Sequence, residues 1–423
     1  MAIAEAQASR TAWGDRPMLR TAMRYGASAC GPIAVSGAHF VASLIFLRLL
    51  SAHEFGLFSF VMVVVAFGMS ATASLVVVPI TQMLVKGGPR ATCFKTNWAV
   101  CAGFGALLFA ALAFSNAPLP EAGVLGLYGA VFAWRWFARN MAYIDGRMHA
   151  AIASDILYSV TLVASLGLLV VLHRMSFTSG SEMLLLACLL ALAPFGTDFL
   201  KTQVMALRDG RLRDYLPIFR DVSRWSLVGV VLTEITVNAH AYLVTFISGA
   251  GSFALLALGM LLMRPASLVQ TALPDMERPA MARAIAAGDM AKLERTRRHF
   301  TWGLIAAWAG TMALVVVILA FFPHLVLKKG YALHDVVIVA TLSALVMAIR
   351  TWRTPLAVLL QAAGEFKALA SIGTISGLVS VAAVLVLLLT VGPVASLGGI
   401  ILGELVILMR VHRMARDWKA AHG

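Results

Sequence analysis

The sequence predicts an all-α membrane protein that crosses the bilayer many times. Its 423 residues are 60% hydrophobic and only 13% charged, and the mean hydropathy is +0.86. Soluble domains carry about 25% charged residues, so a soluble globular class is excluded. The apolar residues also lie in many runs of about 20, the length at which a helix crosses the hydrocarbon core. Both observations indicate a polytopic helical membrane protein.

The apolar runs predict about twelve transmembrane helices joined mostly by short polar connections. Two connections on one side of the membrane are longer, at 205–224 and 274–299. Within the second, residues 281–298 show helical periodicity, with Ile285 and Leu293 as apolar residues and Arg295 and Arg298 as basic ones. This pattern favours a helix lying on anionic lipid at the membrane surface, with a solvated linker as the alternative. The expected spans are 27–50, 56–80, 97–117, 122–144, 152–172, 182–204, 225–247, 251–273, 300–322, 335–361, 368–391 and 393–411.

The basic residues are distributed unevenly between the two sides of these spans. The chain has 34 Lys+Arg against 20 Asp+Glu, a formal net charge of +14. Only Arg48, Arg174, Lys328 and Lys329 fall on the side opposite to the termini. Because positive side chains favour the cytoplasmic side, both termini are expected in the cytoplasm, which requires an even number of spans. The excess charge is a topology signal, and no nucleic-acid partner is expected.

The four cysteines are expected to be packing residues. They show no paired spacing, so neither a disulfide framework nor a metal site follows. They are Cys30, Cys93, Cys101 and Cys188.

The chain repeats itself faintly, and the repeat predicts two similar halves. Arg24 opens the first span and Arg224 the seventh, and His39 and His240 follow at nearly the same interval. An arginine pair in span four also has a counterpart in span ten. Halves with the same orientation indicate parallel repeats related by an axis along the membrane normal, with a central cavity between them. We therefore expect two six-helix bundles, at residues 1–212 and 213–423.

Several short motifs resemble one family of transporters. Residues 46–58, around Glu54 and Gly56, resemble the first hairpin of bacterial polysaccharide-repeat flippases, which belong to the multidrug/oligosaccharidyl-lipid/polysaccharide exporter superfamily. The connection through Gly288 before span nine, and residues 360–364 after span ten, are similar to later parts of these flippases. Ala52 and His53 depart from the family pattern, which leaves the identity of the cargo open.

The resemblance implies a V-shaped cavity, alternating access and no covalent chemistry. The implied activity is translocation of polyprenyl-(pyro)phosphate-linked oligosaccharide repeat units across the bacterial inner membrane, for exopolysaccharide, O-antigen or capsule synthesis. The protein would be a transporter rather than an enzyme, and a monomer surrounded by membrane lipid. A glycan polymerase or export machinery is the implied protein partner. No cofactor is implied, and H⁺ and Na⁺ are the candidate coupling ions.

Arginines inside the predicted spans are the candidate substrate-binding residues. Arg135 and Arg139 are four residues apart and Arg350 and Arg353 three apart, so each pair shares one helix face. A guanidinium stays charged and grips phosphate oxygens in a bidentate fork, and a charge within a span should face protein or water. We expect both pairs to line the cavity and hold the phosphate of the cargo. The alternative is that they extend to the lipid headgroups as topology anchors.

Three further arginines, Arg24, Arg224 and Arg264, lie at predicted cytoplasmic helix ends. There they could contact the phosphate of incoming cargo, and headgroup anchoring is the alternative that we favour.

The remaining candidates are polar residues for coupling or for lining the cavity. Glu234 and Asn238 share one face of span seven, and a buried carboxylate can bind a coupling proton or Na⁺. Static pairing of Glu234 with an arginine is the alternative that we favour. His39 and His240 occupy matching repeat positions, where they would line the cavity or bond neighbouring helices. Three acids, Asp155, Asp198 and Glu404, are expected to be interhelix partners.

Two other functional classes remain open at this stage. A multidrug cation antiporter of the same superfamily should have a cavity dominated by acids, whereas arginines outnumber acids in these spans. A membrane-embedded glycan polymerase or acyltransferase usually needs a sizeable outward loop, and the outward connections here are short. A purely structural scaffold would not need paired intramembrane arginines.

Overall fold

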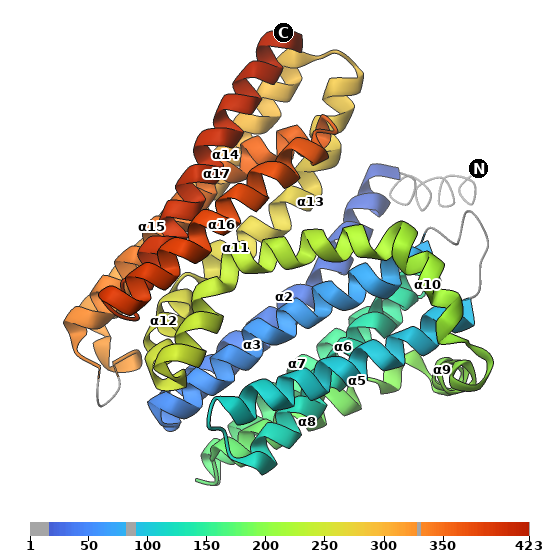
Figure 1. Cartoon of the computed structure of the whole chain (residues 1–423), viewed down its shortest axis with the longest axis vertical. Coiled ribbons are helices and arrows are strands. Elements are labelled where there is room, and N and C mark those ends of the chain that lie inside the picture. Colours follow the sequence, from blue (N-terminus) through green and yellow to red (C-terminus); the bar gives the residue numbers. More distant parts are fainter. Residues whose placement is uncertain (1–16, 82–89, 328–330, 423) are drawn as a thin grey trace, which may run out of the picture.

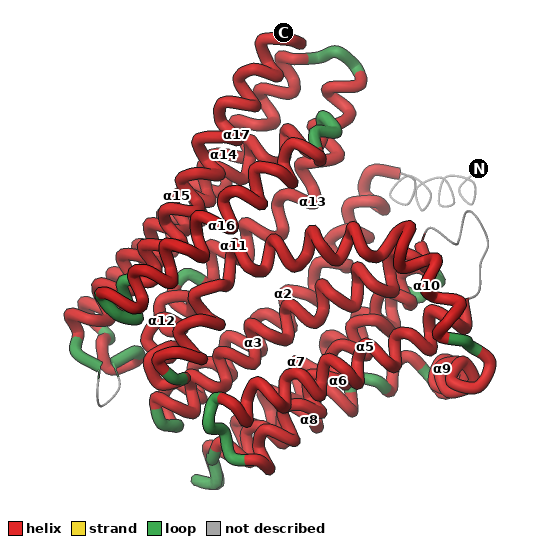
Figure 2. Tube along the Cα trace, viewed as in Figure 1, coloured by secondary structure: helices red, strands yellow, loops and turns green. Residues whose placement is uncertain are grey.

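The computed structural model describes residues 17–81, 90–327 and 331–422, with the side chains of the first helix from Cys30 onward. Regular structure in these ranges is helical throughout, which confirms the predicted fold class (Figure 2). The long helices of the first half are α2 (Pro17–Leu49), α3 (Ala52–Thr72), α5 (Arg90–Phe114), α6 (Leu119–Ile144), α7 (Met148–Val171), α8 (Phe177–Leu190) and α9 (Thr197–Asp209). Those of the second half are α11 (Arg224–Ser248), α12 (Ala250–Leu262), α13 (Arg264–Ala286), α14 (Met290–Phe321), α15 (Leu333–Ala362), α16 (Phe366–Thr390) and α17 (Ser396–His422). The short α10 (Tyr215–Ile218) joins the halves.

The predicted spans all correspond to helices of the described chain. Nine helices are long and apolar enough to cross a membrane, and the bent pair α12 and α13 makes a tenth. Two predicted spans, at 122–144 and 393–411, correspond to helices that are not among these ten, α6 and α17. Both of these helices carry charge inside the bundle, with Arg135 and Arg139 on α6 and Glu404 on α17.

The surface helix predicted over 281–298 is wrong. Those residues form the end of α13 and the start of α14, which are separated by a turn at Gly288 with a φ of 65°. Their apolar face, with Met281 and Leu293, packs in a core with Val411 and Trp418 of α17. An amphipathic stripe fits a protein surface as well as a lipid surface, and here the protein covers it.

Two of the predicted spans are broken helices in the structure. The sixth, predicted over 182–204, is divided into α8, which ends at Leu190, and α9, which begins at Thr197. The chain changes direction before α9 at Gly196, which has a φ of 83°. Figure 1 shows α9 almost end-on, whereas α5 and α6 are seen from the side. The eighth, predicted over 251–273, bends by more than 40° between α12 and α13. Pro265, in the first turn of α13, fits this break because proline lacks the backbone N–H that a continuous helix needs.

The two halves meet along α3 of the first half and α11 and α12 of the second (Figure 1). The approach is tightest near the start of α3, where a Cβ at Gly56 would overlap the carbonyl oxygen of Ala250. A second link lies nearby in the chain, where Nη2 of Arg48 donates to the carbonyl oxygen of His324 at 3.2 Å. These contacts close the end of the molecule opposite to the described termini of α2 and α17.

Candidate functional site

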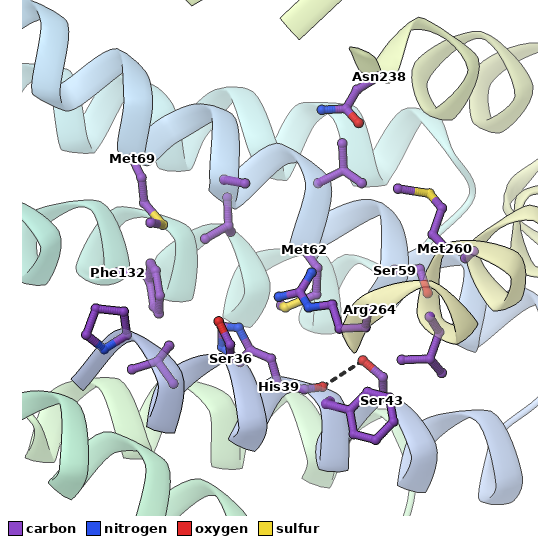
Figure 3. A pocket seen from close by; sticks show the side chains of 18 of the residues that line it. Ser36, His39, Ser43, Ser59, Met62, Met69, Phe132, Asn238, Met260 and Arg264 are labelled. Carbon is purple, nitrogen blue, oxygen red and sulfur yellow. Dashed lines mark hydrogen bonds between the residues drawn. The ribbon is translucent and has the colours of Figure 1, made fainter. Parts of the chain in front are cut away.

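A cavity of about 370 Å³ lies between the two halves (Figure 3). Helices α2, α3, α6 and α7 supply its wall from the first half, and α11, α12 and α13 supply it from the second. Of the predicted site residues, it brings together His39, Arg135, Arg139, Asn238 and Arg264. The lining is otherwise mixed, with serines on α2 and methionines on α3 and α12.

Arg264 is the cation that the second half contributes to this cavity. It is the first residue of α13, directly after the break from α12, and its side chain points into the cavity toward Ser36 and His39 (Figure 3). Among the described residues no carboxylate forms an ion pair with it. Its guanidinium therefore keeps a full positive charge available for an anion. The headgroup anchoring that the sequence favoured does not describe this placement.

Arg135 and Arg139 share the single carboxylate of Asp155. Nη2 of Arg135 lies 2.6 Å from Oδ1, and Nε of Arg139 lies 2.8 Å from Oδ2. Nε of Arg135 also donates to Oγ of Ser154 at 3.1 Å. Gly31 lets α2 pack on this cluster, because a Cβ there would overlap the carboxylate. The predicted interhelix role of Asp155 is therefore seen between α7 and α6.

This cluster forms a charged wall of the cavity. Arg135 is 1% exposed and Asp155 2%, so both are held in place. Together with Arg264, three arginines face one aspartate around the cavity, so these four side chains carry a net positive charge. A site with this excess of positive charge is electrostatically more favourable for an anion than for a cation.

Arg350 and Arg353 form a similar cluster elsewhere in the second half. Nε of Arg350 lies 2.7 Å from Glu404, and Nε of Arg353 lies 3.4 Å from the same carboxylate. Glu404 is 1% exposed, so it joins α15 to α17 as the interhelix partner that the sequence predicted. Within the described chain these two arginines are not part of the cavity lining.

The two histidines have different surroundings despite their matching repeat positions. His39 lies on the cavity wall, and its Nε2 is 2.8 Å from the hydroxyl of Tyr158, which is 3.0 Å from the hydroxyl of Tyr128. His240 is buried on α11, and both of its ring nitrogens lack a hydrogen-bond partner among the described residues.

Glu234 does not pair with an arginine in the described chain, so the predicted static pairing is wrong. Its Oε1 accepts a hydrogen bond of 2.6 Å from the hydroxyl of Tyr242, two turns further along α11. Asn238, one turn from Glu234, lines the cavity. The side chain of Arg24 lies outside the described residues.

Sequence reasoning missed the two tyrosines and the cavity methionines. Tyr158 lies one turn after Asp155 on α7, so the spacing offered a signal for it. Met62, Met69 and Met260 line the cavity, but a methionine in an apolar span looks the same whether it faces a cavity or a packed core. Nothing in the sequence distinguishes those cases.

Comparisons with solved structures show the fold of a known class of transporters. No protein-family profile and no curated protein sequence matches the chain. An inward-facing multidrug resistance MATE family transporter of the MOP superfamily aligns with a TM-score of 0.64 and 14% identity, over 93% of this chain and 98% of that one. The lipid II flippase MurJ in an inward closed conformation aligns with 0.65 and 12%, over 92% and 87%.

A third similar structure is a MOP superfamily transporter from Pyrococcus furiosus, described by the reverse polarity of its binding pocket. It aligns with a TM-score of 0.55 and 16% identity, over 94% of this chain and 95% of that one. At these identities the likeness defines the fold alone. The protein is a multi-pass membrane protein with the fold of MATE transporters and of MurJ.

Replacing Asp155 with asparagine is expected to destabilise the first half strongly. The change keeps the shape but leaves two buried guanidinium groups without a counter-charge, which typically costs about 3–5 kcal/mol. Thermal unfolding of the purified protein in detergent measures the effect. Asp198 is exposed on α9 and forms no ion pair with the described residues, so the interhelix role expected for it is wrong. Asp198→Asn is therefore the matched control and should change stability by no more than about 0.5 kcal/mol. Equal unfolding midpoints for both variants would contradict the structural role of Asp155.

Proposed function

We propose that the protein is a flippase of the MOP superfamily that moves polyprenyl-(pyro)phosphate-linked oligosaccharide repeat units across the bacterial inner membrane. One observation carries the proposal: the cavity between the halves holds more arginines than acids, and Arg264 has no carboxylate partner in the described chain. An anionic phosphate supplies the missing partner, and a guanidinium can bind it through two parallel hydrogen bonds. The transported glycan would serve exopolysaccharide, O-antigen or capsule synthesis.

The arginines have different roles in this proposal because their surroundings differ. Arg264 binds the phosphate directly, while Arg135 and Arg139, fixed by Asp155, provide a positive wall opposite to it. The sugar contacts the polar and methionine side chains of the cavity, and the hydrocarbon tail stays in lipid. Arg350, Arg353 and Arg24 are proposed to act outside this cavity, on the cargo as it enters or leaves.

The fold supports a transporter over an enzyme, since the similar solved structures are transporters and a flippase. Similarity to a multidrug resistance MATE transporter makes a multidrug cation antiporter the second candidate. The excess of arginine in the cavity argues against a cationic cargo. A glycan polymerase or acyltransferase is the third candidate and receives no support from the fold.

We further propose that transport proceeds by alternating access of two bundles, residues 1–212 and 213–423. The contacts of Gly56 with Ala250 and of Arg48 with His324 form the closed outer side, and both termini are cytoplasmic. Coupling to H⁺ or Na⁺ is assigned to Glu234, one turn from the cavity-lining Asn238, and to His39 on the cavity wall. The protein works as a monomer, and a glycan polymerase or export machinery receives the cargo.

Replacing Arg264 with glutamine is expected to abolish most phosphate recognition. A hydrogen bond to a charged group contributes about 1.5–3 kcal/mol, which corresponds to a roughly ten- to hundred-fold loss of transport. The measurement is translocation of a polyprenyl-pyrophosphate-linked oligosaccharide in proteoliposomes, read by access of an external glycan-binding protein. Arg283→Gln, exposed at the far end of α13, should transport normally. Normal transport by the Arg264 variant, or efflux of an organic cation by the wild type, would overturn the proposal.

Replacing Gly56 with leucine is expected to keep the outer side open. The added side chain cannot fit beside Ala250, so the conformations in which α3 and α12 touch become unfavourable and the population shifts away from them. The measurement is labelling of a cysteine placed at Ser43 in a cysteine-free background, with a membrane-impermeant maleimide added from outside. Labelling should become faster and transport should stop. Gly103→Leu, at an open position on α5, serves as control, and equal labelling rates in both variants would contradict the assignment of the outer closure.

A further inference from the structure

A second cavity lies on the other side of α6 from the cavity between the two halves, which we call the substrate cavity. Its volume is about 600 Å³, and α5, α6, α8 and α9 form its walls. On α6 it is lined by Leu127 and Trp134, whereas the adjacent Arg135 lines the substrate cavity. Leu127 is 53% exposed and Leu189 46%, so this surface faces the hydrocarbon of the membrane. We call this cavity the lateral groove.

The lateral groove has the dimensions of a single hydrocarbon chain. The α6 residues that line it run from Gly123 to Trp134, a length of about 16 Å at the helical rise per residue. A volume of about 600 Å³ over that length gives a mean cross-section of roughly 40 Å², about half that of a helix 10 Å wide. Small residues create this space, and a Cβ at Gly123 would meet nothing within 4 Å.

Helix α9 crosses one end of the lateral groove and brings a cation to it. Leu200 and Val204 line the groove, and Arg208 follows one turn later on the same face of α9. Arg208 is exposed, and α9 runs across the direction of α5 and α6 (Figure 1). An amphipathic helix with this orientation lies in the headgroup region of a bilayer. Along this face of α9, two apolar side chains, Leu200 and Val204, are thus followed by the basic Arg208.

An unpaired polar group lies at the same end of the lateral groove. The indole nitrogen of Trp134, which lines the groove and is 5% exposed, has no hydrogen-bond partner among the described residues. A buried donor without an acceptor is costly, so a ligand that carries an oxygen atom at this end would compensate it.

We propose that the lateral groove binds one anionic phospholipid. An acyl chain lies along α5 and α6, the ester oxygens lie near Trp134, and the phosphate pairs with Arg208. The inference depends on the groove and on residence in a bilayer, and it does not rest on the proposed transport function. The site is separated from the substrate cavity by α6, so the bound lipid is a stable ligand rather than cargo.

The test is retention of lipid by the full-length protein. The protein is reconstituted in nanodiscs of phosphatidylglycerol and phosphatidylcholine in equal parts, transferred to detergent and examined by native mass spectrometry. The wild type should keep one phosphatidylglycerol. Gly123→Leu fills the groove and should lower retention by at least about tenfold, equivalent to 1.4 kcal/mol. Gly103→Leu, an exposed glycine on α5 outside the groove, should retain lipid like the wild type.

Two further variants separate the chain site from the headgroup site. Ala106→Leu fills the groove from α5 and should repeat the loss if the Gly123 variant fails to fold, which gel filtration will reveal. Arg208→Gln should still retain a lipid but lose the preference for phosphatidylglycerol over phosphatidylcholine. Arg211→Gln is the control and should retain that preference. Unchanged retention in both groove-filling variants would overturn the proposal. So would a wild type without lipid, or recovery of a polyprenyl phosphate instead of a phospholipid from protein extracted directly from cell membranes.

Discussion

The cost of holding guanidinium groups among apolar helices governs the arrangement of both halves. A charge within a span is stable only when it meets a counter-charge or water. In each half two arginines one turn apart share one buried carboxylate, Asp155 with Arg135 and Arg139, and Glu404 with Arg350 and Arg353. These clusters set which faces of α6 and α7, and of α15 and α17, turn toward each other. They also make Arg264 distinct, since its charge is left available to the cavity.

Much of the fold could be predicted from the sequence because hydropathy and charge act locally along the chain. The spans, the arginine pairs and the acids Asp155 and Glu404 follow from residue types and spacing alone. The placement of Arg264 could not be predicted, because it depends on the break between α12 and α13 and on the approach of the other half. Residues 281–298 show the same limit, since their apolar stripe fits protein or lipid equally well.

The two halves carry similar motifs but contribute differently to the cavity. The repeat suggested equal roles for His39 and His240 and for the two arginine pairs. In the structure the first half supplies His39, its tyrosine partners and the charged wall, while His240 and Arg350 lie within the second half. A sequence repeat therefore predicts a shared arrangement of helices. It does not predict equal side-chain roles, because the two halves present different surfaces to the cavity.

The contact of Gly56 with Ala250 is made by backbone atoms and the absence of a side chain. A seal of this kind carries no chemical preference for whatever passes it. In the proposed transport cycle, cargo recognition lies deeper, around Arg264, on other residues and mostly other helices. Under that proposal the side chains of the cavity can change during evolution to suit a different cargo, while the backbone contact between Gly56 and Ala250 stays the same.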